Sequence, residues 1–273
     1  MRYDLHTHSI FSDGTWTPQQ LVAAAAEQDL TVALTDHNTV SGLPIFLETA
    51  QKLGVEAVPG IEFSTDYLEK DVHIVALFVR EESYDAIRAY AAKGDRAKER
   101  SNRDMVRRLQ AAGYELNYDE IVAQTPDGRI NRANIAGELV RLGYVASVQE
   151  AFSRLLHPKH GFFTPPKRPG SWDTVAFIRS IGALPVLAHP LLTMDEEMLR
   201  GFLPEAKARG LAAMETAYSS YDAQTAALAR QIAGEFGLLP SGGSDFHGDR
   251  KPDIQLGCPA ISRQDFENLR AAL

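Results

Sequence analysis

The chain has 273 residues, 44% of them hydrophobic, which is enough for one large α/β domain with or without an insert. Its one cysteine, Cys258, excludes a disulfide framework and a cysteine-rich zinc site. The net charge of -8 argues against binding of long nucleic acid, which usually needs a basic face. We expect no secretory leader, and no apolar run approaches the roughly 18 residues that span a bilayer. We therefore expect a cytoplasmic protein that binds no membrane.

The first sixty residues alternate between predicted strands and helices. A strand begins near Tyr3, and Thr17-Pro18 is typical of a helix start, with an N-cap residue followed by proline. Further elements are expected in the order strand, helix and strand, over residues 31–35, 41–53 and 55–58. This alternation predicts a parallel sheet.

The pattern changes after residue 80. The segment from about 83 to 112 reads as a charged helix, and three shorter helical segments follow, near 117–124, 131–142 and 147–156. No convincing strand lies between residues 80 and 183, after which strands and helices alternate again. We therefore predict a small all-helical insert over residues 100–166. The rest of the chain, residues 1–99 and 167–273, would form the main α/β domain.

The first strand and the loop after it carry His6, His8 and Asp13. Side chains alternate along a strand, so His6 and His8 point to the same side. Two imidazoles at a strand end can bind a divalent metal, and Asp13 can add a carboxylate from the turn that follows. A solvated loop that happens to hold histidines is the alternative, because the H-x-H motif is short.

Other histidines and carboxylates follow, or lie within, apolar runs further along the chain. They occur in Thr35-Asp36-His37, Pro59-Gly60-Ile61-Glu62, the run with His73, Ala188-His189-Pro190 and Gly243-Ser244-Asp245-x-His247. The carboxyl ends of parallel strands meet at one face of an α/β barrel. We therefore expect these side chains to form a cup of metal ligands at that face.

In this order the motifs resemble those of the PHP (polymerase and histidinol phosphatase) family, and the resemblance covers nearly the whole chain. It is closest to stand-alone phosphoesterases with a helical insert before the Ala-His-Pro motif. The resemblance implies a distorted (β/α)7 barrel with two or three divalent metal ions, which are typically manganese, iron or zinc. Imidazole and carboxylate ligands without a thiolate suit all three metals and do not choose among them.

The resemblance also implies a ligand set for each metal. One metal would be held by His6, His8, Glu62 and Asp245. A second would use Glu62 as a bridge, together with His73 and His189. A third would use Asp13, His37 and His247. Of these residues, the ones expected to take part in catalysis are Asp13, His37, Glu62, Asp245 and His247.

Two carboxylates beside the expected ligands are candidates for supporting roles. Asp36 is adjacent to His37 and is expected to orient a ligand, with a simple turn residue as the alternative. Glu215 ends a predicted strand and could face the cup, where a role in orienting a ligand and a purely structural role are both open.

The predicted reaction is hydrolysis of a phosphate ester by a hydroxide that bridges the metals. The resemblance favours a small phosphorylated nucleotide of the 3′,5′-bisphosphate type as the substrate. The alternatives are 5′→3′ exonuclease activity on short oligonucleotides and histidinol-phosphate phosphatase activity. A non-catalytic metal-binding module is a further alternative from another class of protein.

Residues in and beside the insert are candidates for substrate binding. Arg132 matches an arginine that relatives tend to have at a helix start, but Asn134 stands where a histidine is more usual. Further candidates for binding the same substrate are Arg129, Lys159, His160, Lys167 and Arg168, since cationic side chains suit phosphate. Ordinary exposed charges are the alternative. We expect the insert to act as a lid, because long excursions from a compact barrel are often functional.

Overall fold

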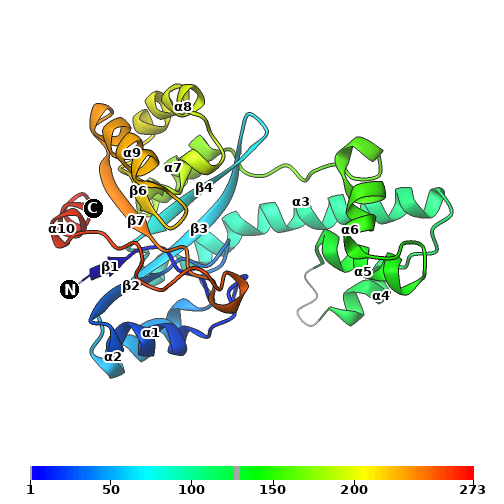
Figure 1. Cartoon of the computed structure of the whole chain (residues 1–273), viewed down its shortest axis with the longest axis horizontal. Coiled ribbons are helices and arrows are strands. Elements are labelled where there is room, and N and C mark those ends of the chain that lie inside the picture. Colours follow the sequence, from blue (N-terminus) through cyan, green and yellow to red (C-terminus); the bar gives the residue numbers. More distant parts are fainter. Residues whose placement is uncertain (1, 126–129) are drawn as a thin grey trace. The chain divides into compact units, whose positions relative to one another are not determined.

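The computed structural model describes residues 2–125 and 130–273. The chain folds into two compact units (Figure 1). The barrel unit consists of Met1–Ala91 and Pro169–Leu273, and the helical unit consists of Ala92–Arg168. The long helix α3 (Tyr84–Ala111) begins in the first unit and ends in the second. No helix within the described residues is long and apolar enough to cross a membrane.

The barrel unit is built on one seven-stranded sheet whose strands pair in the order of the chain (Figure 1). The strands are β1 (Arg2–Asp4), β2 (Leu30–Leu34), β3 (Ala57–Tyr67), β4 (Lys70–Leu77), β5 (Leu184–Leu187), β6 (Ala213–Tyr218) and β7 (Leu239–Gly243). The residues that follow β1 also pair with β7, since Leu5 N donates to Gly242 O at 3.2 Å. The sheet is therefore a nearly closed barrel, as the sequence predicted.

β4 departs from the parallel sheet that the sequence predicted, because it runs antiparallel to both β3 and β5. Leu68 and Glu69 form the tight turn between β3 and β4, and their φ angles of 49° and 65° are typical of a two-residue hairpin. The hairpin also makes β3 longer than predicted. As a result Glu62 lies within a strand, and His73 pairs with Ser64 near the start of β4.

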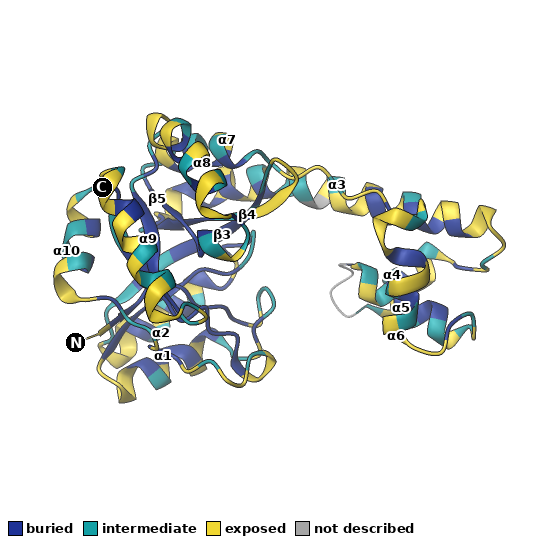
Figure 2. Cartoon of the chain, turned by 45° about the horizontal axis from the view of Figure 1, so that its top comes forward, coloured by how far each residue is buried: buried dark blue, intermediate teal, exposed yellow. Residues whose placement is uncertain are grey.

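Helices surround the strands of the barrel unit. They are α1 (Pro18–Glu27), α2 (Leu43–Leu53), α7 (Ser171–Ser180), α8 (Glu196–Ala208), α9 (Ala223–Glu235) and α10 (Arg263–Ala271). Thr17 caps α1 in a reciprocal pair with Gln20, and Gly54 ends α2 with a left-handed φ of 68°. Figure 2 shows buried residues concentrated on the strands and exposed residues on the outer faces of the helices.

Side chains alternate between the two faces of each strand, so the core of the barrel unit has two layers. On β4, Ile74 and Ala76 belong to the cluster shared with the surrounding helices, whereas Val75 and Leu77 belong to a second cluster. That second cluster includes Phe266 from α10, whose ring stacks on Tyr3 with centroids 4.3 Å apart. Both clusters position the strand ends that carry the candidate site.

The helical unit has a core of its own, which includes Met105, Leu109, Ile135 and Leu139. Besides the end of α3 it contains α4 (Tyr118–Gln124), α5 (Arg132–Arg141) and α6 (Val148–Ala151). Among the described residues, no strand lies between β4 and β5. The helical character predicted for this part of the chain is therefore confirmed.

Candidate metal centre

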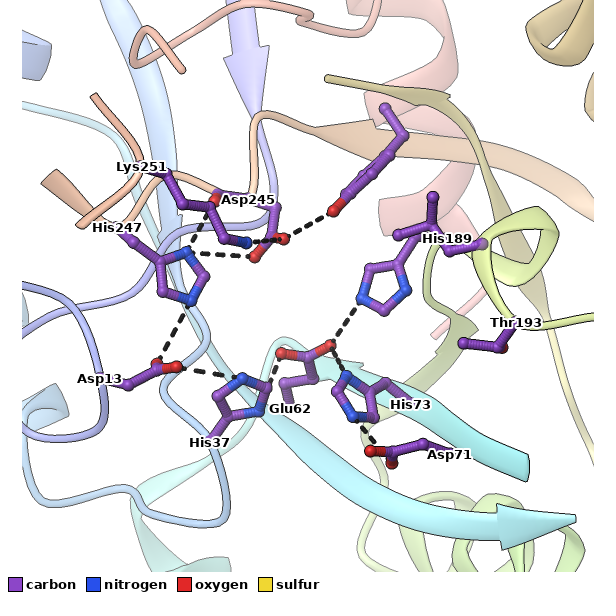
Figure 3. A pocket seen from close by; sticks show the side chains of 12 residues that line it. Asp13, His37, Glu62, Asp71, His73, His189, Thr193, Asp245, His247 and Lys251 are labelled. Atoms are coloured by element: carbon purple, nitrogen blue, oxygen red, sulfur yellow. Dashed lines mark hydrogen bonds and ion pairs between the residues drawn. The ribbon is translucent and has the colours of Figure 1, made fainter. Parts of the chain in front are cut away.

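The nine side chains predicted as metal ligands all lie in the barrel unit, and contacts through Glu62 and Asp13 connect them into one cluster (Figure 3). Three groups have ligand atoms within 4.8 Å of one another. They are His6, His8, Glu62 and Asp245; His37, Glu62 and His73; and His8, Asp13, His37 and His247. His189 joins through its Nε2, which lies 3.1 Å from Glu62 Oε1.

Pairing beyond the ends of β1 and β7 brings the first and last ligands together. Asp245 N donates to His6 O at 2.8 Å, and Thr7 bridges to Phe246 in parallel fashion. Gly243 makes this close approach possible, because a Cβ there would lie 2.5 Å from His6 N. A bridge between His37 and Glu62 likewise connects the chain after β2 to β3.

The first group has the spacing of a metal site. The Nε2 atoms of His6 and His8 lie 3.1 Å apart, and they lie 3.1 and 3.2 Å from Glu62 Oε2. Asp245 Oδ1 lies 3.5 and 3.1 Å from the same two nitrogens. Ligands about 2.0–2.2 Å from a tetrahedral ion are separated by about 3.3–3.6 Å. The side chains therefore fit a divalent cation at their centre.

Hydrogen bonds on the far side of the rings fix which nitrogen faces the cluster. Glu215 Oε1 accepts from His6 Nδ1 at 2.8 Å, so the lone pair of His6 is at Nε2, beside the other ligand atoms. The Nδ1 of His247 donates to the carbonyl of Asp245 at 2.8 Å, and Asp71 contacts His73 Nε2 at 3.1 Å. Such partners raise the basicity of a metal-binding imidazole.

Two polar atoms at the centre lack a hydrogen-bond partner within the described part of the chain. They are His37 Nδ1 and Glu62 Oε2, and they lie 3.0 Å apart. Buried polar atoms are almost always satisfied, so this pair indicates a missing electrophile. A cation shared by the two atoms would satisfy both.

The electrostatics of the cluster also favour added positive charge. Burial disfavours ionisation of Glu62, but His37, His6 and His73 outweigh it and hold the pKa of that carboxyl well below its usual range. Burial lowers the pKa of His8, yet the neighbouring carboxylates of Asp245 and Glu62 outweigh it and raise the pKa to about 9. The carboxylates thus attract protons to the rings when no metal is bound, and a divalent ion would replace them.

Two of the ligands have a strained backbone. His189 has a φ of 28° and Asp245 a φ of 56°, in the left-handed region that non-glycine residues rarely adopt. Such strain is typical of functional sites, where the surrounding structure compensates for it. The Glu215 carboxylate contributes here, because its Oε2 accepts from His189 N at 2.7 Å.

The two carboxylates predicted to support the site have different partners. Glu215 contacts His6 and the backbone of His189, as described above. Asp36 accepts hydrogen bonds from Ser9 N at 2.8 Å, Ser9 Oγ at 2.7 Å and Ser12 Oγ at 2.6 Å. Asp36 therefore holds the turn between His8 and Asp13 directly, and the Ser12 hydroxyl that it accepts from lies 3.5 Å from His8 Nδ1.

A pocket of about 280 Å³ opens onto the cluster. Its lining includes ligands from all three groups, together with Asp71, Leu192, Thr193, Tyr218 and Lys251. Figure 3 shows the rings of His37, His73, His189 and His247 arranged around this opening. The pocket gives a small anionic substrate direct access to the candidate ligands.

Sequence reasoning missed Tyr218 and Lys251, which both contact Asp245 Oδ2, at 2.8 and 2.7 Å. Glu215 and Tyr218 are three residues apart, so a regular strand would point them to opposite faces. An irregularity in the pairing of β6 with β7, between Glu215 and Ala217, reverses that alternation. No local sequence signal marks the irregularity.

Asp4 was missed for a similar reason. It is fully buried, and it accepts hydrogen bonds from the backbones of Ser244 and Gly257, each at 2.8 Å. Burial raises the pKa of its carboxyl, although these hydrogen bonds oppose the change. Asp4 connects β1 to the segment after β7, and nothing near it in the sequence indicates those partners.

The residues predicted to bind substrate that the structure describes all lie in the helical unit. The Arg132 guanidinium stands 4.4 Å from the ring centre of Phe163. Asn134 accepts from Asn131 N at 2.8 Å and so caps α5, a structural role. Lys159 is exposed, Arg168 is near enough to help lower the pKa of Arg132, and Arg129 lies outside the described residues.

Comparisons with known proteins agree with this geometry. Residues 4–161 match the PHP domain. A 5′-3′ exoribonuclease of Haemophilus influenzae is 32% identical over 90% of both chains. A 3′,5′-nucleoside bisphosphate phosphatase of Chromobacterium violaceum is 28% identical over 99% of this chain and 97% of its own. The structure of an amidohydrolase from Chromobacterium violaceum with bound sulfate, 28% identical, has a TM-score of 0.78 over 100% of this chain and 97% of that one.

The fold and the cluster thus define a metal-dependent hydrolase of phosphoric esters. The chain belongs to the PHP domain family.

Proposed function

We propose that this phosphoesterase hydrolyses a phosphate ester of a small phosphorylated nucleotide, of the 3′,5′-bisphosphate type. The observation that supports this substrate class most directly is the similarity, over 99% of the chain, to a 3′,5′-nucleoside bisphosphate phosphatase. The pocket of about 280 Å³ is of a size for a small substrate.

We propose three metal positions. His6, His8, Glu62 and Asp245 would hold one ion; Glu62, His73 and His189 would hold a second; and Asp13, His37 and His247 would hold a third. Divalent ions bound there acidify water and neutralise the charge of a phosphoryl group. The donor set is compatible with manganese, iron or zinc.

Glu62 has the central role among these side chains. Its Oε1 lies 2.8 Å from His73 Nδ1 and 3.1 Å from His189 Nε2, whereas its Oε2 faces His6 and His8. One carboxylate therefore joins two sets of ligands. Glu62 is fully buried within β3, so its position is fixed by the sheet.

Arg132 and Arg168 of the helical unit are candidates for binding a second phosphate group. Burial lowers the pKa of Arg132, and the nearby positive charge of Arg168 lowers it further. A bound anion would offset these positive charges, and guanidinium groups suit phosphate. The role of residues 100–166 as a lid, and the substrate contacts of Asn134 and Lys159, stay predictions.

The second candidate is 5′→3′ exonuclease activity on short oligonucleotides. The exoribonuclease of Haemophilus influenzae, 32% identical to this chain, favours it. Both candidates hydrolyse a phosphate ester, a monoester in the first case and a diester in the second, and they also differ in what binds beyond it. A net charge of -8 is unfavourable for long nucleic acid but does not exclude a short oligonucleotide.

The deciding experiment is a substrate panel with the manganese-loaded protein. We would measure kcat/KM for adenosine 3′,5′-bisphosphate, adenosine monophosphates, a short 5′-phosphorylated RNA and histidinol phosphate. The proposal predicts the highest value for the bisphosphate. A higher value for the RNA would favour the exonuclease instead, and a preference for histidinol phosphate would contradict both.

A further inference from the structure

Lys251 is a cationic residue in the pocket that the proposed function does not yet use. The short 3-10 turn Gly248–Arg250 comes directly after the ligand His247, and Lys251 follows that turn. Its Nζ lies 2.7 Å from Asp245 Oδ2, and its side chain is 40% exposed. Figure 3 shows Lys251 beside Asp245 at the edge of the pocket.

Lys251 is a cation in a pocket lining that is otherwise rich in carboxylates. The lining contains the carboxylates of Asp13, Glu62, Asp71 and Asp245, and among the described residues Lys251 is its one lysine or arginine. A phosphate monoester carries a charge of about −1.5 to −2 at pH 7. Three other cations predicted to bind substrate, Arg132, Lys159 and Arg168, lie in the helical unit. Lys251 instead belongs to the compact unit that holds the metal ligands.

The hydrogen bonds of Asp245 leave Lys251 available for a second partner. Tyr218 donates its hydroxyl to Asp245 Oδ2 at 2.8 Å from a buried position, while Asp245 Oδ1 faces His6 and His8. The buried Tyr218 hydroxyl therefore holds this carboxylate independently of Lys251. An ammonium group has three N–H donors, and among the described residues its one acceptor is Asp245.

We propose that Lys251 binds a phosphoryl oxygen of the substrate with the remaining donors of its ammonium group, while Tyr218 positions Asp245. This role rests on the proposed phosphoesterase function. It means that a residue of the barrel unit itself binds the anionic group of the substrate. The ion pair with Asp245 holds the flexible lysine side chain beside the pocket before substrate arrives. Less side-chain entropy is then lost when the phosphoryl group binds.

The test compares Lys251→Met and Tyr218→Phe with Lys52→Met. Lys52 is a matched control because it also pairs with a carboxylate, Glu48 at 2.5 Å, but lies at the end of α2 and does not line the pocket. Metal content would be measured by mass spectrometry after manganese loading. Binding of inorganic phosphate would be measured by calorimetry, which does not depend on turnover.

We expect Lys251→Met to keep its metal and to weaken phosphate binding by about tenfold or more, as for loss of a charged hydrogen bond. Lys251→Arg, which keeps the cation, should regain much of that affinity and would show that a weakened Met variant is not misfolded. Tyr218→Phe should instead lose metal. Lys52→Met should match the wild type in both measurements.

Two outcomes would overturn the inference. Unchanged phosphate affinity in Lys251→Met would show that the lysine does not contact the anion. A parallel loss of metal and phosphate binding would show that it acts only through Asp245. Failure of the proposed function would give a result different from failure of the Lys251 inference. The wild type would still bind phosphate through Lys251, but it would not prefer the bisphosphate in the substrate panel.

Discussion

Glu215 Oε1 accepts a hydrogen bond from His6 Nδ1 at 2.8 Å, across 209 residues of sequence. The other oxygen of Glu215 accepts from the backbone N–H of His189 at 2.7 Å. One carboxylate thereby orients an imidazole and holds the strained backbone of a second ligand. Both contacts depend on its having two acceptor oxygens.

Glu215→Gln should weaken metal binding because an amide has only one acceptor oxygen for these two donors. We expect a loss of about 10–100-fold in metal affinity or in kcat/KM, as is typical for partners of metal ligands. Manganese titration and turnover of adenosine 3′,5′-bisphosphate would measure it. Glu205→Gln, at an exposed ion pair with Arg209, is the control. Unchanged metal affinity in Glu215→Gln would mean that backbone packing alone orients His6.

Asp13→Ala should reduce turnover far more than stability. Asp13 lies in a turn with a side chain 39% exposed, and its carboxylate is 3.3 Å from His247 Nε2. Its removal should cost about 1 kcal/mol or less of folding free energy. As a ligand, however, it would hold the third metal. A variant with normal melting temperature and normal kcat would show that Asp13 is not a catalytic ligand.

Arg132→Ala should weaken hydrolysis of the bisphosphate more than that of a monophosphate, because only the former has a remote phosphate. Binding energy at a remote group can position the reacting ester. The measurement is kcat/KM for both substrates. Arg154→Ala is a control in the same unit, at an exposed pair with Glu150. An equal loss for both substrates would mean that Arg132 does not distinguish a second phosphate.

The metal-free protein should lose stability as the pH rises above neutrality. The pKa of His8 is about 9 and that of His73 about 10, because Glu62 and other carboxylates outweigh the effect of burial. Both values exceed the unfolded value of about 6.5, so the folded state binds these protons more tightly. That contribution is complete below the unfolded pKa and disappears as the pH rises through the folded values.

Bound metal should remove this pH dependence between about pH 7 and 10, because metal ions replace the protons on the two rings. Melting temperatures across that range, with manganese and with a chelator, would measure the difference. Metal binding at pH 7.5 should also release protons, which calorimetry in buffers of different ionisation enthalpy detects. Equal pH profiles with and without metal would contradict the proposed occupation of the site.

Local features of the sequence were sufficient to predict much of this protein. The alternation of His6 and His8, the cap at Thr17 and the glycine after α2 depend on neighbouring residues only. The order of the motifs indicated the family and the nine candidate ligands, because each motif lies within a few residues of chain. The helical character after residue 80 was equally local, since charge and the absence of apolar alternation mark it.

Only the tertiary structure decided the features that depend on pairing between segments far apart in the chain. The antiparallel direction of β4 places His73 beside Glu62, and the irregularity after Glu215 turns Tyr218 toward Asp245. Strand direction and register result from hydrogen bonds between segments far apart in the chain. The contact of Lys251 with Asp245 likewise depends on the path of the chain after β7. Short-range patterns specify the ligand types, but only these long-range contacts set how their atoms are oriented.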